Sequence, residues 1–195
     1  MHKHQIDFHS MTPHQLGDTY RIEALPYIYS YLDSGTDQER KAAALAIKKF
    51  RWKGYECHEA LSFLIANLKN SVAQTRYHTL KTLLSWKNLS RYEDRIMEAA
   101  MVEQKEYNKK LFTKVMKQTQ NQDYIDLWQE ALNRESDGFV WQRPDAATKL
   151  VVLKLCRMRH DEGVQPHLLL DLIEDELLAS FPAIEKRTPQ KRALF

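Results

Sequence analysis

The feature that most constrains this chain is an internal repeat with a period of 36 residues. The triplet Glu23-Ala24-Leu25 returns, without a gap, as Glu59-Ala60-Leu61. The same offset places apolar residues on apolar residues and an arginine on an arginine. Matched pairs are Ile28 with Leu64, Leu32 with Leu68, Arg40 with Arg76, Ile47 with Leu83, and Phe50 with Trp86. A fixed period of about 20 to 50 residues is typical of stacked helical repeats, so the chain is predicted to fold as a series of helix pairs.

The spacing of apolar residues within each repeat predicts two helices. In the first repeat Leu25, Ile28, Tyr29 and Leu32 follow the i, i+3, i+4, i+7 pattern of a single helical face. Helices are predicted over residues 21–32 and 37–51, and again over 58–69 and 72–86. A third pair, 90–102 and 106–118, is less regular, because the 36-residue offset from Arg76 falls on Phe112. A further helix is predicted over 122–133.

Two segments of the first repeat resemble a HEAT repeat. They are residues 23–28, EALPYI, and residues 40–47, RKAAALAI. In that family a proline bends the first helix of each pair, and Pro26 matches it. A basic residue early in the second helix links adjacent repeats, and Arg40 and Arg76 match it. The resemblance is close over residues 23–86.

The chain departs from the HEAT pattern at three positions. Ser62 stands where the second repeat would have its proline, and Glu39 and Thr75 stand where an aliphatic residue precedes the arginine. The resemblance implies an all-α, right-handed α-solenoid, in which the second helix of each pair, here called the B helix, lines the concave surface.

Four segments are expected along the chain. Residues 1–20 are predicted to be a flexible leader, 21–135 to be HEAT-like repeats, 136–185 to be a divergent C-terminal helical cap, and 186–195 to be a basic tail. The chain has only five glycines, which favours helices over sheets joined by tight turns.

Composition predicts a cytoplasmic protein without a cofactor. No apolar run reaches about 18 residues, so no membrane span is expected. The N-terminus lacks the apolar core of a secretion signal. Cys57 and Cys156 are expected to be reduced thiols packed in helices. The leader histidines, such as His2, His4 and His9, are interpreted as solvated rather than as a metal site, because no carboxylate or cysteine completes the set.

The B helices share a positive charge, although the net charge of the chain is only +3. The predicted basic stripe consists of Arg40, Lys41, Lys48, Arg76, Lys81, Lys109, Lys110 and Lys114. Such a stripe attracts phosphate backbones or acidic proteins. The alternative is that these lysines are solvated and only keep the protein soluble. The residues between 161 and 185, by contrast, include seven acids and no lysine or arginine.

No catalytic motif is present. A glycine-rich phosphate loop, a Gly-x-Ser-x-Gly segment and a His-Glu-x-x-His segment are all missing from the sequence. The chain is therefore not predicted to be an enzyme. Trp141, in an apolar loop, is a candidate partner anchor, or it folds back over the end of the repeats.

Three functions follow as hypotheses. The first is a non-catalytic scaffold that binds a protein with an acidic surface on the basic B-helix face. The second is a nucleic-acid-binding module that uses the same residues. The third, implied only by the family resemblance, is an enzyme such as a DNA-alkylation glycosylase or a bilin lyase. Self-association stays open.

Overall fold

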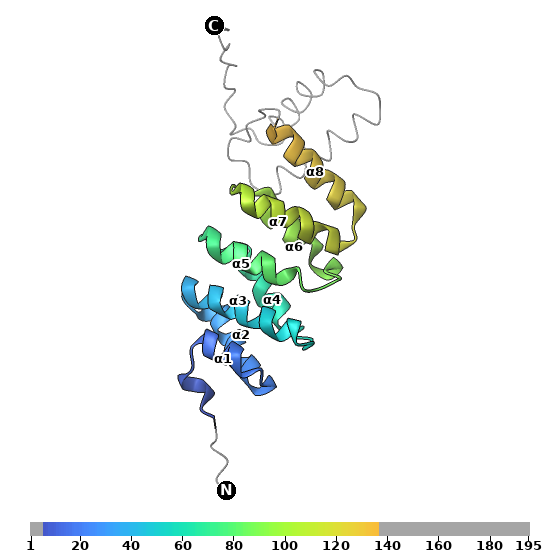
Figure 1. Ribbon diagram of the computed structural model, residues 1–195. Coiled ribbons are helices and arrows are strands. Elements are labelled where there is room, and N and C mark those ends of the chain that lie inside the picture. The colour runs from blue at the N-terminus through green and yellow to red at the C-terminus, as the bar shows by residue number, and fades with distance from the viewer. Residues whose placement is uncertain (1–5, 137–195) are drawn as a thin grey trace, which may run out of the picture. The chain divides into compact units, whose positions relative to one another are not determined.

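The computed structural model describes residues 6–136, and this part of the chain is helical without any strand. The predicted cap beyond Ser136, the basic tail, Cys156 and Trp141 lie outside the described residues. Figure 1 shows the helices following one another in chain order. They are α1 (Pro13–Thr19), α2 (Leu25–Ser34), α3 (Asp37–Trp52), α4 (Ala60–Asn67), α5 (Ala73–Leu83), α6 (Glu93–Met101), α7 (Glu106–Met116) and α8 (Gln122–Ser136).

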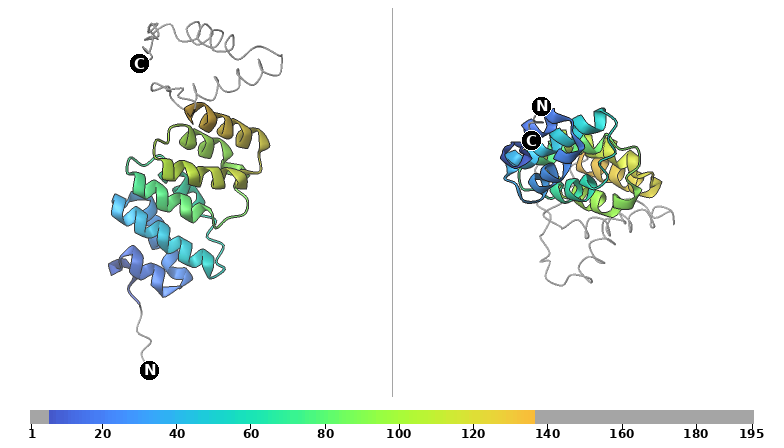
Figure 2. Two further views of the ribbon diagram at one scale, coloured as in Figure 1. Left: turned by 45° about the horizontal axis from the view of Figure 1, so that its top comes forward. Right: turned by 90° about the horizontal axis from the view of Figure 1, so that it is seen from below.

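The helices contact one another in pairs and in rows. The helix α2 packs on α3, α4 on α5, and α6 on α7, as the repeat predicts. The B helices α3, α5 and α7 also contact one another in succession, and α1 extends this row by packing on α3. On the other side α2 contacts α4, and α6 contacts α8. Figure 2 shows the same succession from two further directions.

Local sequence explains where α3 begins and ends. The side chain of Thr36 accepts a hydrogen bond from the Glu39 backbone amide, and the Glu39 carboxylate accepts one from the Thr36 amide at 2.8 Å, which forms a capping box. The preceding Gly35 has no room for a side chain, because a Cβ there would lie 2.5 Å from the carbonyl oxygen of Tyr31. After the helix, Gly54 adopts a φ of +92°, which favours glycine.

The core lies between the paired helices. Ile28, Ile47, Leu64, Leu80 and Phe112, from five different helices, are completely buried. Three consecutive small residues of α3, Ala42 to Ala44, are buried and let α5 approach closely. Thr82 of α5 reaches across and donates a hydrogen bond to the carbonyl oxygen of Ala44 in α3 at 2.9 Å.

The N-terminal segment contains more structure than the sequence predicts. Thr12 and Gln15 form a capping box, and Pro13 occupies the first helical turn, where its missing N–H costs nothing. Gly17 lies inside α1, buried against Ala46 of α3. A Cβ on Gly17 would lie 2.8 Å from the Cβ of Ala46, so the glycine permits the close approach of the two helices.

Three further local expectations need correction. The helix predicted from residue 21 begins at Leu25, after a short 3₁₀ turn, so Pro26 lies in the first turn of α2 rather than bending its interior. Cys57 is buried but lies in the connection between α3 and α4, with a φ of +43°. Tyr107 fits the apolar stripe of the helix predicted over 106–118, yet it is 39% exposed on α7.

Candidate macromolecule-binding face

The eight basic residues of the predicted stripe fall into two groups. Three of them, Arg40, Arg76 and Lys109, are bonded to other parts of the helical framework. The other five are Lys41, Lys48, Lys81, Lys110 and Lys114, and none of them forms a hydrogen bond or ion pair with another described residue.

Arg40 joins the first helix pair to the second. Its Nε donates to the carbonyl oxygen of Gly35 at 2.7 Å, and one terminal nitrogen donates to that of Asp33 at 2.6 Å, at the end of α2. The other terminal nitrogen donates to Oδ1 of Asn67, at the end of α4, at 3.0 Å. Asn67 is itself buried and donates back to the carbonyl oxygen of Leu32. All three nitrogens of the guanidinium are thus bonded to acceptors within the helical framework.

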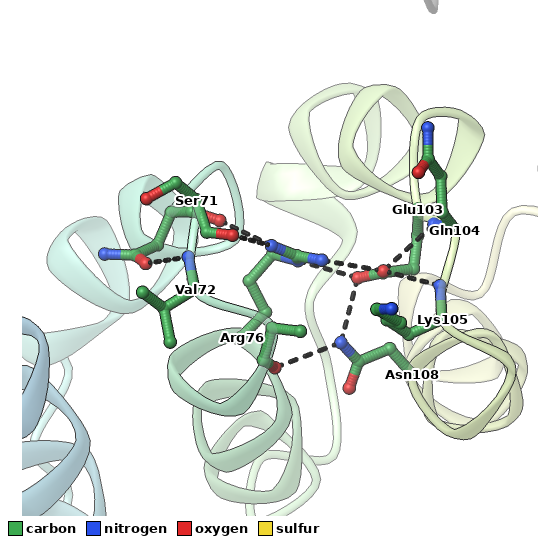
Figure 3. Close-up of polar contacts among 9 residues, drawn as sticks. Ser71, Val72, Arg76, Glu103, Gln104, Lys105 and Asn108 are labelled. Atoms are coloured by element: carbon green, nitrogen blue, oxygen red, sulfur yellow. Dashed lines mark hydrogen bonds and ion pairs between the residues drawn. The ribbon is translucent and has the colours of Figure 1, made fainter.

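Arg76 makes the equivalent connection one repeat later, as Figure 3 shows. It donates from Nε and from a terminal nitrogen to the two carboxylate oxygens of Glu103, at 2.7 and 2.8 Å. The remaining nitrogen donates to the carbonyl oxygens of Asn70 and Ser71. A bidentate pair of this kind is both strong and geometrically specific.

Glu103 is the most buried acid of this network, with a side chain only 1% exposed. It also accepts hydrogen bonds from the backbone amides of Gln104 and Lys105 and from Nδ2 of Asn108. Burial acts to raise the pKa of the Glu103 carboxyl, but the hydrogen bonds from Arg76, Lys105 and Asn108 outweigh it, so the pKa lies below its ordinary value. The carboxylate is thus held ionised beside Arg76.

Lys109 completes the series at the third pair. Its Nζ forms an ion pair with Glu135 in α8 and another with Glu106, the latter at 3.1 Å. Burial acts to lower the pKa of Lys109, but the hydrogen bonds from its ammonium to Glu135 and Glu106 outweigh it, so the pKa is raised.

The three residues occupy one position, the fourth residue of α3, α5 and α7 respectively. Arg40 and Arg76 each bond to an acceptor 27 residues later, and Lys109 bonds to one 26 residues later. The third repeat is therefore in register, but Lys109 follows Arg76 by 33 positions instead of 36, so a rigid overlay lands on Phe112. The charges of these three residues serve contacts between helix pairs, so they are left out of the surface described next, and their part in binding stays a prediction.

Of the five unpaired lysines, Lys110 and Lys114 are exposed and the other three are partly exposed. Lys41 and Lys48 are two turns apart on α3, and Lys110 and Lys114 are one turn apart on α7. Lys81 lies on α5, which packs on α3. Burial, followed by the positive charges of Lys41, Lys81 and Lys48, lowers the pKa of His78. The Nδ1 atom of His78 is buried without a hydrogen-bond partner among the described residues.

Aromatic side chains alternate with these lysines. The Lys48 ammonium lies 4.8 Å from the ring centre of Trp52, and that of Lys81 lies 4.8 Å from the ring of Tyr77. Tyr77 in turn contacts Tyr107 of α7 edge to face, with ring centres 5.7 Å apart. Cation–aromatic pairs thus lie on α3 and on α5, and the tyrosine pair joins α5 to α7. Trp52 is 75% exposed, the largest exposure among the apolar and aromatic side chains of the described region.

We call this surface the lysine–aromatic face. It consists of Lys41, Lys48 and Trp52 from α3, Tyr77, His78 and Lys81 from α5, and Tyr107, Lys110 and Lys114 from α7. The acids of these helices are confined to their first turns, namely Asp37 and Glu39 in α3 and Glu106 in α7, while α5 has none. The cations therefore gather without acids among them, which costs electrostatic repulsion until an anionic partner binds.

The sequence indicated five of the nine residues of this face. Trp52, Tyr77, His78 and Tyr107 were missed. The sequence did contain a signal for the aromatic residues, namely an aromatic residue and a lysine at i, i+4 spacing on a predicted basic helix. This spacing occurs in Lys48 with Trp52 and in Tyr77 with Lys81.

Other chemistry has little support in the described region. Residues 6–136 contain no group of three or more histidine, cysteine or acidic side chains placed to hold a metal ion. Burial raises the pKa of the Cys57 thiol to about 11, so it is not a thiolate nucleophile at neutral pH. None of the described helices combines the length and apolar character that a bilayer crossing needs.

Comparisons with protein-family models, with curated proteins and with solved structures give no match to this chain.

Proposed function

We propose that residues 21–135 form a right-handed, HEAT-like α-solenoid that acts as a non-catalytic binding module. The repeated bond from the fourth residue of each B helix to the next pair supports this arrangement. Such a bond ties each helix pair to its successor, as a linear stack requires, because each repeat contacts mainly its neighbours.

The module binds an acidic macromolecule on the lysine–aromatic face. The observation that carries this proposal is the gathering of five unpaired lysines and three aromatic rings on adjacent B helices, with no acid between them. The lowered pKa of His78, caused by burial and then by the charges of Lys41, Lys81 and Lys48, is consistent with this gathering of positive charge. The scaffold for an acidic protein and the nucleic-acid module are the two forms that this function can take.

Binding of model polyanions to the full chain tests this function. The probes are a labelled poly-glutamate peptide, single-stranded oligonucleotides and matching duplexes, measured by fluorescence anisotropy at low and physiological salt. We expect at least one probe to bind at low salt. Replacing Lys41, Lys48 and Lys81 together by glutamine should weaken that binding at least about 10-fold. With three cations fewer, fewer counterions are released from the polyanion when the protein binds.

The matched control removes the same charge elsewhere. Lys69, Lys87 and Arg95 are exposed and lie outside the B helices, so replacing all three by glutamine also lowers the net charge by three. Equal weakening by both triple variants, or no binding of any probe at low salt, would contradict a site on the lysine–aromatic face.

The glycosylase hypothesis stays a prediction from the family resemblance. Release of a base from alkylated DNA would support it, and no described residue is assigned a role in that reaction.

A further inference from the structure

We infer that the partner of the lysine–aromatic face is a single-stranded nucleic acid, with lysines on its phosphates and aromatic rings on its bases. This inference rests on the proposed function and adds the chemical class of the partner. Three observations carry it: the kind of cation that is available, the exposure of the aromatic rings, and their alternation across three helices.

The available cations are all lysines. Both arginines of the predicted stripe, Arg40 and Arg76, have all three guanidinium nitrogens bonded to framework acceptors. Protein–protein interfaces are enriched in arginine and depleted in lysine, whereas a lysine ammonium suits a phosphate as a point charge. A face whose five unpaired cations are all lysines therefore fits a phosphate backbone better than an acidic protein.

The aromatic rings distinguish a single strand from a duplex. Trp52 is 75% exposed and Tyr107 is 39% exposed, so both rings offer apolar surface to a partner. In a duplex the bases are stacked inside and have no free face for a protein ring. In a single strand each base can stack on an aromatic side chain, which stabilises the complex by about 1–3 kcal/mol per base.

The alternation of cations and rings matches the alternation of phosphates and bases along a strand. Lys48 lies beside Trp52 on α3, Lys81 beside Tyr77 on α5, and Lys110 and Lys114 follow Tyr107 on α7. Neighbouring helix axes are about 8–10 Å apart, so α3 and α7 are separated by roughly 16–20 Å, enough for a strand of several nucleotides. The strand would cross the B helices in succession.

The salt dependence of binding gives a number that can be measured. For single strands the slope of log K against log salt is about −0.7 per phosphate contact. If all five lysines contact phosphates, the slope is about −3.5, and the glutamine variant of Lys41, Lys48 and Lys81 should reduce its magnitude by about 2.

The deciding experiment compares labelled 15-nucleotide oligo(dT) and oligo(rU) with duplexes of the same length, using the full chain. We expect the single strands to bind at least about 5-fold more tightly than the duplexes. Trp52→Leu should weaken single-strand binding about 10-fold while leaving the salt slope unchanged, because it removes a stacking platform and no charge. Phe63→Leu, on the other row of helices, is the matched control and should have no effect.

Each other outcome has a distinct meaning. Equal binding of duplex and single strand, with no effect of Trp52→Leu, would overturn the single-strand inference. Binding of the poly-glutamate peptide alone would overturn a nucleic-acid partner but leave the proposed function standing. Failure of every probe to bind would overturn both.

Discussion

At the scale of single residues, Glu103 shows how a buried charge is maintained in this fold. Its carboxylate has five hydrogen-bond donors around it, two of them from Arg76. Removing one member of such a buried pair leaves the other charge uncompensated, which costs more than the pair contributes as a whole. The structure therefore makes a specific prediction about stability and pH.

Glu103→Gln should lower the free energy of unfolding by about 2–4 kcal/mol at pH 7. The folded pKa of Glu103 lies below the ordinary value of 4.5, so its contribution is fully present above that pH and is lost as the pH falls through the folded pKa. The stability difference between wild type and variant should therefore shrink below about pH 4.5. Urea denaturation followed by circular dichroism over a pH series measures it.

The exposed acid Glu98, paired with Lys69, provides the control for this measurement. Glu98→Gln should change stability by less than about 1 kcal/mol, as is usual for a surface pair. If the difference in unfolding free energy between wild type and Glu103→Gln stays constant as the pH falls, the ionised form of Glu103 does not stabilise the fold as proposed.

Two adjacent lysines should behave in opposite ways. Lys109→Gln breaks the ion pairs to Glu106 and Glu135, so we expect a loss of about 1–3 kcal/mol in stability and little change in polyanion binding. Lys110→Gln removes an exposed, unpaired charge, so stability should change by less than about 0.5 kcal/mol while polyanion binding weakens. Chemical denaturation measures the stability of the two variants, and anisotropy titration measures their affinity for a polyanion. If Lys109→Gln and Lys110→Gln change stability and affinity equally, the division into a framework lysine and a binding lysine is wrong.

At the scale of helices, the contact between α1 and α3 depends on a glycine. The backbone of α1 approaches Ala46 so closely that even a methyl group on Gly17 would meet the Cβ of Ala46 at 2.8 Å and its Cα at 3.0 Å. This approach lets a helix of only seven residues pack firmly at the start of the B-helix row.

Gly17→Ala should therefore destabilise the protein by about 1–3 kcal/mol, although alanine favours a helix by about 1 kcal/mol over glycine. Ala46→Gly in the same chain removes the opposing methyl group. The double variant should recover a large part of the loss caused by Gly17→Ala, and a double-mutant cycle of unfolding free energies measures this coupling. Additive effects of the two substitutions would mean that the contact is looser than the structure indicates.

At the scale of the described molecule, the helix pairs share one continuous core. Leu64 of α4 is completely buried at a place where α4 contacts both α2 and α5. An aspartate there would bury a charge without a partner, which the fold cannot accommodate. Because each pair covers the apolar face of its neighbour, the damage should spread along the repeats.

Leu64→Asp should accordingly remove most of the helical signal in circular dichroism. Hydrogen exchange should show that amide protection is lost from α2 to α7, and not in α4 and α5 alone. Ala66→Asp introduces the same charge on an exposed position of the same helix and should remain folded. A near-native melting temperature for Leu64→Asp would count strongly against the shared core.

The sequence by itself determined seven of the eight helices in the described region, α1 being the exception, and their pairing. These properties depend on nearby residues, such as the capping pair Thr36 and Glu39, and on the 36-residue spacing of apolar side chains. The same local information could not show that Gly17 lies within a helix contact, because that role depends on Ala46 in another helix.

Only the tertiary structure decided which charges are available for binding. The HEAT resemblance marks Arg40 and Arg76 as links between repeats, but the sequence identifies neither their acceptors nor Lys109 as the third member of the series. Each of the three has an acceptor 26 or 27 residues later that the fold brings to it. Likewise, Tyr107 fits an apolar helical stripe, yet it contacts Tyr77 on the outside of the neighbouring B helix. Local periodicity specifies which side chains share a helix face, whereas the partner that a side chain meets depends on how separate helices pack against one another.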